Sequence, residues 1–197
     1  MATKDTKTRF LDAALRIYAR DPEQLNVHAI VAESGASLGS LYHHFGNMDG
    51  LCAALYARCM GNLLEAIARA LETARSARSG TFALVRTYLE FARTSPAAAR
   101  FIHASAYASF VPAHASDIAL SKSQPLARIR AFFMRHVRTG ALVQLNETYL
   151  EMLLIGPVAE VTRRYLGGEP FDLQQAAEVL APRVWRSVAR AAQTTRA

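Results

Sequence analysis

The sequence predicts an all-α protein with about nine helices in two domains, residues 1–47 and 48–197. Apolar residues recur three and four positions apart along most of the chain, which is the periodicity of helices with one buried face. Serine, asparagine and aspartate precede these segments and glycine follows them, as at helix ends. The sequence shows no strand-like alternation, no internal repeat and no low-complexity tract, so no other fold class competes.

The first predicted helix spans about residues 5–20. Phe10, Leu11 and Tyr18 belong to its apolar stripe. The helix is expected to end before Pro22, because proline cannot continue the hydrogen-bond ladder and restricts the residue before it. A short connection then leads to the next helix, as expected of a compact three-helix domain.

Two short helices joined by a tight turn are predicted between Asn26 and Phe45. Asn26 and Ser37 are the expected N-caps, because their side-chain oxygens can accept hydrogen bonds from unpaired amides of the first turn. Gly35 stands between the helices, where a left-handed backbone ends the first of them. Leu41 and Phe45, four residues apart, share the face that packs back onto the first helix. This arrangement is typical of a helix-turn-helix.

The second helix of this pair directs short polar and aromatic side chains away from its buried face. Such groups can reach the phosphates and base edges of DNA. A plain αα-hairpin has the same spacing, so the pattern alone leaves DNA binding and simple packing equally open. The candidate DNA-binding residues are Asn26, His28, Ser37, Leu38, Gly39, Ser40, Tyr42, His43, His44 and Asn47.

The run G-A-S-L-G-S-L-Y-H-H-F at residues 35–45, followed by G-N-M-D-G-L at 46–51, resembles the DNA-binding domain of the TetR family of bacterial repressors. Residues 6–18, T-K-T-R-F-L-D-A-A-L-R-I-Y, are similar to that family's first helix. The resemblance implies a homodimer that binds a pseudo-palindromic operator in double-stranded DNA. Two positions depart from the family pattern: Met48 stands where a phosphate-contacting lysine is common, and Leu38 where a polar or basic residue is frequent.

The positive charge of the chain lies outside this region. The formal net charge is +7, but residues 1–60 contain six basic and six acidic residues, so residues 61–197 carry all of the excess. The second helix of the pair has neither lysine nor arginine. Phosphate contacts would therefore depend on Lys4, Lys7, Arg9 and helix N-termini.

Six further helices are predicted after the helix-turn-helix. A long one begins at Met48, and the residues around Gly80 separate it from the next. Ser95, Asn146 and Asp172 are the expected N-caps of three later helices. The predicted helices span about residues 48–76, 81–93, 96–109, 124–138, 146–166 and 172–192, with residues 112–123 as loop or broken helix.

Two further sites are expected from the resemblance to the TetR family. The middle helices would enclose an apolar or aromatic small-molecule effector, although each aromatic taken separately is better explained by core packing. The last two helices would form a four-helix dimer bundle with a second copy; the alternative is that they face their own core. The candidate ligand residues are Phe91, His103, Tyr107, Phe110, Phe133, His136, Tyr149 and Met152, and the candidate dimer-interface residues are Leu150, Leu154, Val158, Val161, Leu180, Val184, Trp185 and Val188.

Other classes of function have little support in the sequence. It contains no zinc-like spacing of histidine and cysteine, no G-x-S-x-G elbow and no glycine-rich phosphate loop, so we expect no catalytic residues, no metal and no cofactor. Cys52 and Cys59 are too few for a disulfide framework and are best explained as core residues. No apolar run approaches the ~20 residues of a membrane span, and the N-terminus does not resemble a signal peptide, so a cytoplasmic protein without a membrane partner is expected.

The sequence therefore predicts a ligand-responsive, DNA-binding transcriptional regulator, acting as a repressor that its effector releases. The alternative is a protein of the same fold that has lost specific DNA binding and acts as a protein-interaction adaptor. The neutral residues 1–60, together with Leu38 and Met48, favour that alternative. An all-α enzyme or lipid carrier would need a deep polar site, which the sequence does not indicate.

Overall fold

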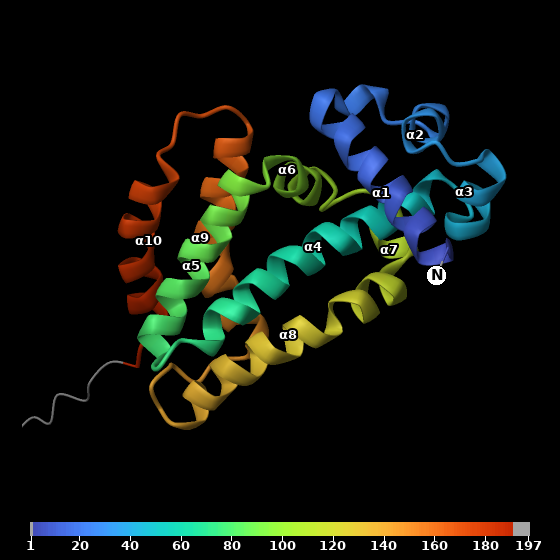
Figure 1. The fold of residues 1–197 in the computed structure, drawn as a ribbon. Coiled ribbons are helices and arrows are strands. Elements are labelled where there is room, and N and C mark those ends of the chain that lie inside the picture. The colour runs from blue at the N-terminus through green and yellow to red at the C-terminus, as the bar shows by residue number, and fades with distance from the viewer. Residues whose placement is uncertain (1, 191–197) are drawn as a thin grey trace, which may run out of the picture. The chain divides into compact units, whose positions relative to one another are not determined.

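The computed structural model describes residues 2–190, with side chains from residue 6 onward (Figure 1). Ten α-helices and one short 3₁₀ helix, η1, occur in this range, and the only strand-like pairing in it is an isolated bridge, so the predicted all-α class is confirmed. The elements are α1 (Ala2–Arg20), η1 (Pro22–Gln24), α2 (Val27–Ser34), α3 (Leu38–Phe45), α4 (Met48–Glu72), α5 (Ala77–Thr94), α6 (Pro96–Ala104), α7 (Phe110–Ala113), α8 (Ala115–Arg138), α9 (Glu147–Leu166) and α10 (Leu173–Val188).

The helices pack into two compact units. The first is Met1–Asn62 with Ser95–Ser123, and the second is Leu63–Thr94 with Gln124–Ala197. The helices α4 and α8 each contribute residues to both units. This is a division by packing; the predicted division by function after residue 47 stays a prediction.

In the first unit, α1 packs against α2, α3 and α6. Phe10 of α1 is fully buried, and its ring meets that of Phe45 edge-on with 6.0 Å between centroids. Ile30 of α2 and Leu41 of α3 are also fully buried. Burying an apolar side chain of this size stabilises a fold by about 1.5–3 kcal/mol, so this small core fixes the orientation of α3.

In the second unit, α5, α9 and α10 pack on one another, as Figure 1 shows. Val85, Val158 and Val184 are buried, one from each of these helices. The helix α8 approaches α5 closely at Gly80: a Cβ atom built there would lie 2.2 Å from Cε1 of Phe132. Gly80 is therefore an interior helix residue at a close contact.

The structure corrects several predicted helix ends. The break expected around Gly80 lies earlier, because α4 ends at Glu72 rather than near residue 76 and α5 already begins at Ala77. Residues 115–123 are the first turns of α8, which continues through the buried Pro125. The predicted sixth helix ends early, at Ala104, and α7 follows separately, so ten helices replace the expected nine. Ser95 precedes Pro96 as predicted, but its side chain makes no capping hydrogen bond.

The last helix also ends earlier than predicted. The helix α10 stops at Val188, and the expected end near Ala192 lies outside the described residues. The amide of Val143 donates to the carbonyl of Val188 at 2.9 Å, and Ala189 forms an antiparallel bridge with Leu142. The chain after α10 is thus extended because it pairs with the loop between α8 and α9.

The helix α4 is the one described helix with the length and mean hydropathy, 1.2, of a possible membrane span. However, 56% of its apolar window is buried inside the protein. Helices in the cores of proteins meet the same criterion of length and composition, so this helix is weak evidence for a membrane span.

Candidate nucleic-acid interface and cavity

The turn between α2 and α3 has the geometry that the sequence predicts. Oδ1 of Asn26 accepts from the amide of Ala29 at 3.0 Å, and Oγ of Ser37 accepts from the amide of Ser40 at 3.2 Å, so both expected N-caps are confirmed. Gly35 ends α2 with φ 64° and ψ 23°. A left-handed backbone of this kind favours glycine, since a Cβ atom would be strained there.

The face of α3 opposite Leu41 and Phe45 is exposed. Tyr42 retains 46% of its surface and Leu38 retains 40%, and His43 and Gly39 are exposed beside them. This exposed face of α3 is the surface available for a partner. It combines an aromatic hydroxyl, an imidazole and an apolar side chain around a glycine that has no neighbour within 4 Å of a built Cβ.

Other predicted DNA-binding residues have structural roles as well. His44 is half-buried, with its ring centroid 6.5 Å from that of Phe10, so it packs beneath α3. Oδ1 of Asn47 accepts from the amide of Gly50 at 2.8 Å, which caps α4. Ser40 is half-buried, whereas His28 is exposed at the start of α2. His28 therefore remains available to a partner, while Asn47 is held as a cap.

The arginines of α1 are engaged within the protein. Nη2 of Arg9 donates to the carbonyl of Ser34 at 2.6 Å, which supports the turn after α2. Arg16 and Arg20 both pair with Glu33 of α2, at 3.0 and 2.8 Å. These hydrogen bonds, that of Arg20 first and that of Arg16 second, hold the pKa of Glu33 below its ordinary value of 4.5. Exposed pairs of this kind stabilise little, and the single carboxylate of Glu33 neutralises one of the two arginine charges.

Two basic side chains of α1 lie beside the ends of α3: Arg9, which keeps its charge because its partner is a neutral carbonyl, and Lys7. Nζ of Lys7 lies 5.7 Å from the centroid of the Phe45 ring, close to the end of α3. The side chain of Lys4 lies outside the described residues. The unpaired amides at the N-termini of α2 and α3 are the other groups that favour phosphate.

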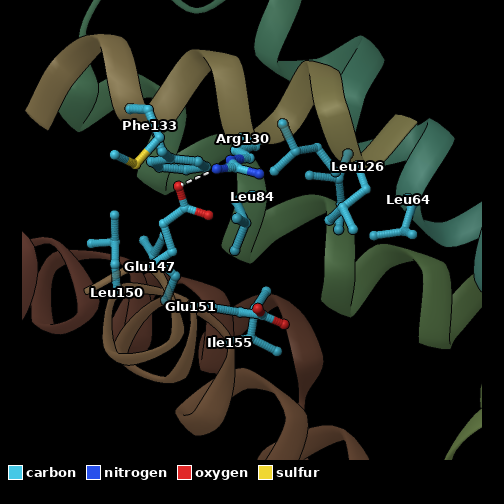
Figure 2. Close-up of a pocket in the computed structure, with 13 residues that line it drawn as sticks. Leu64, Leu84, Leu126, Arg130, Phe133, Glu147, Leu150, Glu151 and Ile155 are labelled. Carbon is cyan, nitrogen blue, oxygen red and sulfur yellow. Dashed lines mark ion pairs between the residues drawn. The ribbon is translucent and has the colours of Figure 1, made fainter. Parts of the chain in front are cut away.

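A separate cavity of about 220 Å³ lies in the second unit (Figure 2). Its walls come from α4, α5, α8 and α9 and are mostly apolar, with Leu84, Phe133 and Leu154 among them. Nη2 of Arg130 lies 2.6 Å from Oε1 of Glu147 at its edge. A largely apolar cavity with a few polar groups is typical of a small-molecule site.

The cavity contains one of the eight predicted ligand residues, Phe133. Tyr107 is fully exposed, and Tyr149 and Met152 are also largely exposed. His103 and Phe110 belong to the first unit. Phe91 and His136 are half-buried outside the lining; burial and the charge of Arg135 lower the pKa of His136.

Three charged residues of the lining were not predicted from the sequence: Arg130, Glu147 and Glu151. The four-residue spacing of the two glutamates beside Leu150 and Leu154 marks the edge of an apolar stripe and was the available signal. Most of the aromatic residues predicted as ligand contacts instead pack elsewhere in the protein or lie on the surface.

The predicted dimer-interface residues fall into two groups. Five are buried within their own chain, which is the alternative that the sequence left open: Leu150, Leu154, Val158, Val184 and Val188. Val161, Leu180 and Trp185 are half-buried and keep surface that a second copy could cover.

The described residues contain no group of three or more histidine, cysteine, aspartate or glutamate side chains that could hold a metal ion. Cys52 and Cys59 are free and buried, and burial raises the pKa of each thiol to about 11. Thiols of this kind are poor nucleophiles at neutral pH.

Two short capped helices, joined by a glycine turn and presenting one exposed helix face, define the helix-turn-helix class. Residues 10–55 match the family model described as bacterial regulatory proteins, tetR family. These residues, from within α1 to the start of α4, are therefore a TetR-family amino-terminal domain, and the resemblance stated above is confirmed. Regulators of this family are in general transcription factors rather than enzymes.

The whole chain has the fold of solved TetR-family transcription regulators. One from Marinobacter aquaeolei VT8 has a TM-score of 0.78 and 17% identity, over 95% of this chain and 97% of that one. Another from Shewanella sp. PV-4 has a TM-score of 0.76 and 19% identity, over 93% and 98%. The regulator FadR from Bacillus subtilis, solved in complex with stearoyl-CoA, has a TM-score of 0.70 and 16% identity, over 90% and 96%. A sequence comparison with curated proteins gave no match.

Proposed function

We propose that this protein is a ligand-responsive transcription repressor that binds operator DNA through α3. The observation that carries the proposal is the exposed face of α3, held by a capped helix-turn-helix within residues 10–55, the segment that matches the TetR family. In such domains the second helix lies in the major groove and its outward side chains contact base edges.

The exposed side chains of α3 suit direct readout. The hydroxyl of Tyr42 and the imidazole of His43 can donate or accept hydrogen bonds at phosphates and base edges. Leu38 can contact a thymine methyl group in the major groove. Gly39 leaves room for the DNA backbone, while Ser37 orients the N-terminus of α3 as its cap.

The repressor would act as a homodimer on a pseudo-palindromic operator. Two recognition helices related by two-fold symmetry read half-sites about 34–36 Å or a larger spacing apart. The half-buried side chains of Val161, Leu180 and Trp185 on α9 and α10 support a dimer surface there, because they leave apolar area uncovered.

The cavity of the second unit would hold the effector. The Bacillus subtilis FadR structure contains stearoyl-CoA, so a chain of this fold can accept a partly apolar ligand. An effector lowers DNA affinity only to the extent that it binds the DNA-free conformation more tightly than the DNA-bound one.

Selection of random duplex DNA on the full chain tests DNA binding. We expect enrichment of a pseudo-palindrome, and Tyr42→Ala should weaken binding of the selected duplex about tenfold or more, since one good base-edge contact contributes about 1–3 kcal/mol. Tyr107→Ala is the matched control, because Tyr107 is fully exposed but lies outside the helix-turn-helix. Recovery of no motif, with only weak and salt-sensitive binding, would refute the repressor proposal.

One observation favours the adaptor as a second candidate. The exposed face of α3 carries Leu38 and Tyr42 but neither lysine nor arginine, and a mixed apolar and aromatic surface also suits a protein partner. The same selection experiment separates the two, because an adaptor would enrich no DNA motif.

A further inference from the structure

The cavity of the second unit has an unbalanced set of charges. Three of its lining residues are charged: Arg130, Glu147 and Glu151. Arg130 and Glu147 form an ion pair, drawn as a dashed line in Figure 2, and so neutralise each other. Glu151 has no ion pair among the described residues and lies one helical turn after Glu147 on α9. The lining therefore carries a formal charge of −1.

The negative charge of the lining favours some classes of ligand over others. An anionic ligand would have to displace Glu147 from Arg130 and would then lie near the second carboxylate, Glu151. A neutral apolar ligand would cover apolar wall but would partly dehydrate Glu151 without replacing its water contacts, which costs free energy. A cation avoids both costs, because its charge pairs with the carboxylate of Glu151.

The apolar wall suits the body of such a ligand. Phe133 adds aromatic surface to the lining. Met134 adds a polarizable thioether, and Leu84 and Leu154 add aliphatic surface. A volume of about 220 Å³ limits the ligand to a small molecule.

We propose that the cavity binds a small hydrophobic ammonium compound, with the apolar body against Phe133 and the ammonium group paired with Glu151. This proposal rests on the proposed function, in which the same cavity is the effector site. An exposed ion pair changes affinity roughly two- to fivefold, so the expected preference for a cation over a neutral analogue is roughly two- to fivefold.

Isothermal titration calorimetry on the full chain without DNA tests the proposal, with phenylbutylammonium, phenylbutanol and phenylbutanoate as probes. The ammonium should bind roughly two- to fivefold more tightly than the alcohol, and the carboxylate should bind most weakly. Glu151→Gln, which removes the charge with little change of shape, should bring ammonium and alcohol to about equal affinity. Glu178→Gln is the control, because Glu178 lies on α10 outside the cavity lining.

A second variant reverses the selectivity. Glu147→Gln frees Arg130 from its partner, so binding of phenylbutanoate should increase roughly two- to fivefold. Leu126→Trp, at a partly exposed lining position, should reduce binding of all three probes and so locate them in the cavity.

The proposal is overturned if the alcohol or the carboxylate binds the wild-type chain as tightly as the ammonium, if Glu151→Gln changes nothing, or if no probe binds. Failure of the proposed function is a separate outcome. In that case duplex selection yields no motif, or the ammonium binds in calorimetry without releasing the selected duplex.

Discussion

Replacing Gly80 with alanine tests how closely α5 and α8 approach each other beside the cavity. A Cβ atom at this position would lie 2.2 and 2.3 Å from two ring atoms of Phe132, and 3.3 Å from Cδ2 of Leu71. The Phe132 ring cannot move freely, because it is only 8% exposed and packs against the rings of Phe133 and His136. Gly80→Ala therefore forces either the ring or a helix to shift.

Two opposing contributions determine how far Gly80→Ala changes the free energy of unfolding. Alanine is favoured over glycine inside a helix by about 1 kcal/mol. Overpacking a core costs typically about 1–3 kcal/mol, and a contact this short belongs at the upper end of that range. Gly80→Ala should thus lower the free energy of unfolding by about 2 kcal/mol, which corresponds to a fall in Tm of about 4–8 °C for a chain of this size.

Thermal unfolding followed by circular dichroism measures this effect. Gly61→Ala is the matched control, because Gly61 is also inside a helix and a Cβ there meets nothing within 4 Å, so its Tm should rise slightly. Combining Gly80→Ala with Phe132→Leu should give a smaller loss than the two single changes added together. A rise in Tm for Gly80→Ala, equal to that of Gly61→Ala, would refute the close contact.

Three further changes test other parts of the structure. Glu33→Gln should release its two arginine partners and steepen the salt dependence of binding to non-specific duplex DNA, by about one unit for each arginine that reaches a phosphate; an unchanged slope would contradict this. The folded-state pKa of Glu33 is lowered, so its carboxylate stabilises the fold above its ordinary pKa of 4.5. This contribution is lost as the pH falls through the lowered value. In urea unfolding, the free energy of unfolding of Glu33→Gln should therefore depend less on pH in that range than that of the wild type. Ser37→Ala removes the N-cap of α3 and should lower the free energy of unfolding by about 1 kcal/mol. Ser37→Asn keeps a capping side chain and should retain most of the wild-type stability. An equal loss of stability in both variants would argue against capping. Iodoacetamide should label Cys52 and Cys59 slowly at pH 7.5 in the native protein and completely in urea, and rapid native labelling would be inconsistent with thiols of pKa about 11.

Local signals in the sequence predicted the helix-turn-helix correctly. The cap at Asn26, the left-handed Gly35 and the cap at Ser37 each depend on hydrogen bonds or backbone angles within a few residues. Interactions of such short range leave a recognisable residue type at a fixed offset. The burial of Leu41 and Phe45 followed in turn from their four-residue spacing.

The helix boundaries that were predicted wrongly depend on how the helices pack, and not on residues a few positions away. Gly80 resembles a helix break, yet it lies inside α5, at a position where the ring of Phe132, more than fifty residues away in the chain, occupies the space that a side chain would need. Pro125 resembles a helix start, yet ten helical residues precede it in α8. The end of α10 depends likewise on pairing of Ala189 with Leu142.

The residues that line the cavity could not be predicted from the sequence for a similar reason. Its lining comes from four helices, so only the packed fold brings Arg130 of α8 and Glu151 of α9 into one lining. Of the eight ligand residues predicted from residue type, Phe133 alone belongs to that lining. By contrast, the exposed face of α3 belongs to a single helix, and its periodicity was sufficient to predict it.

The engagement of Arg16 and Arg20 by Glu33 bears on how such a protein would search a genome. Long-range attraction to DNA, and sliding along it, depend on positive charges that are not already neutralised. Residues 1–60 contain as many acidic as basic residues, so this helix-turn-helix would associate at an unsteered rate and leave non-specific DNA quickly, and it would sample sites mainly by dissociating and rebinding. Occupancy of its operator would then respond more to the copy number of the protein than to changes in intracellular salt.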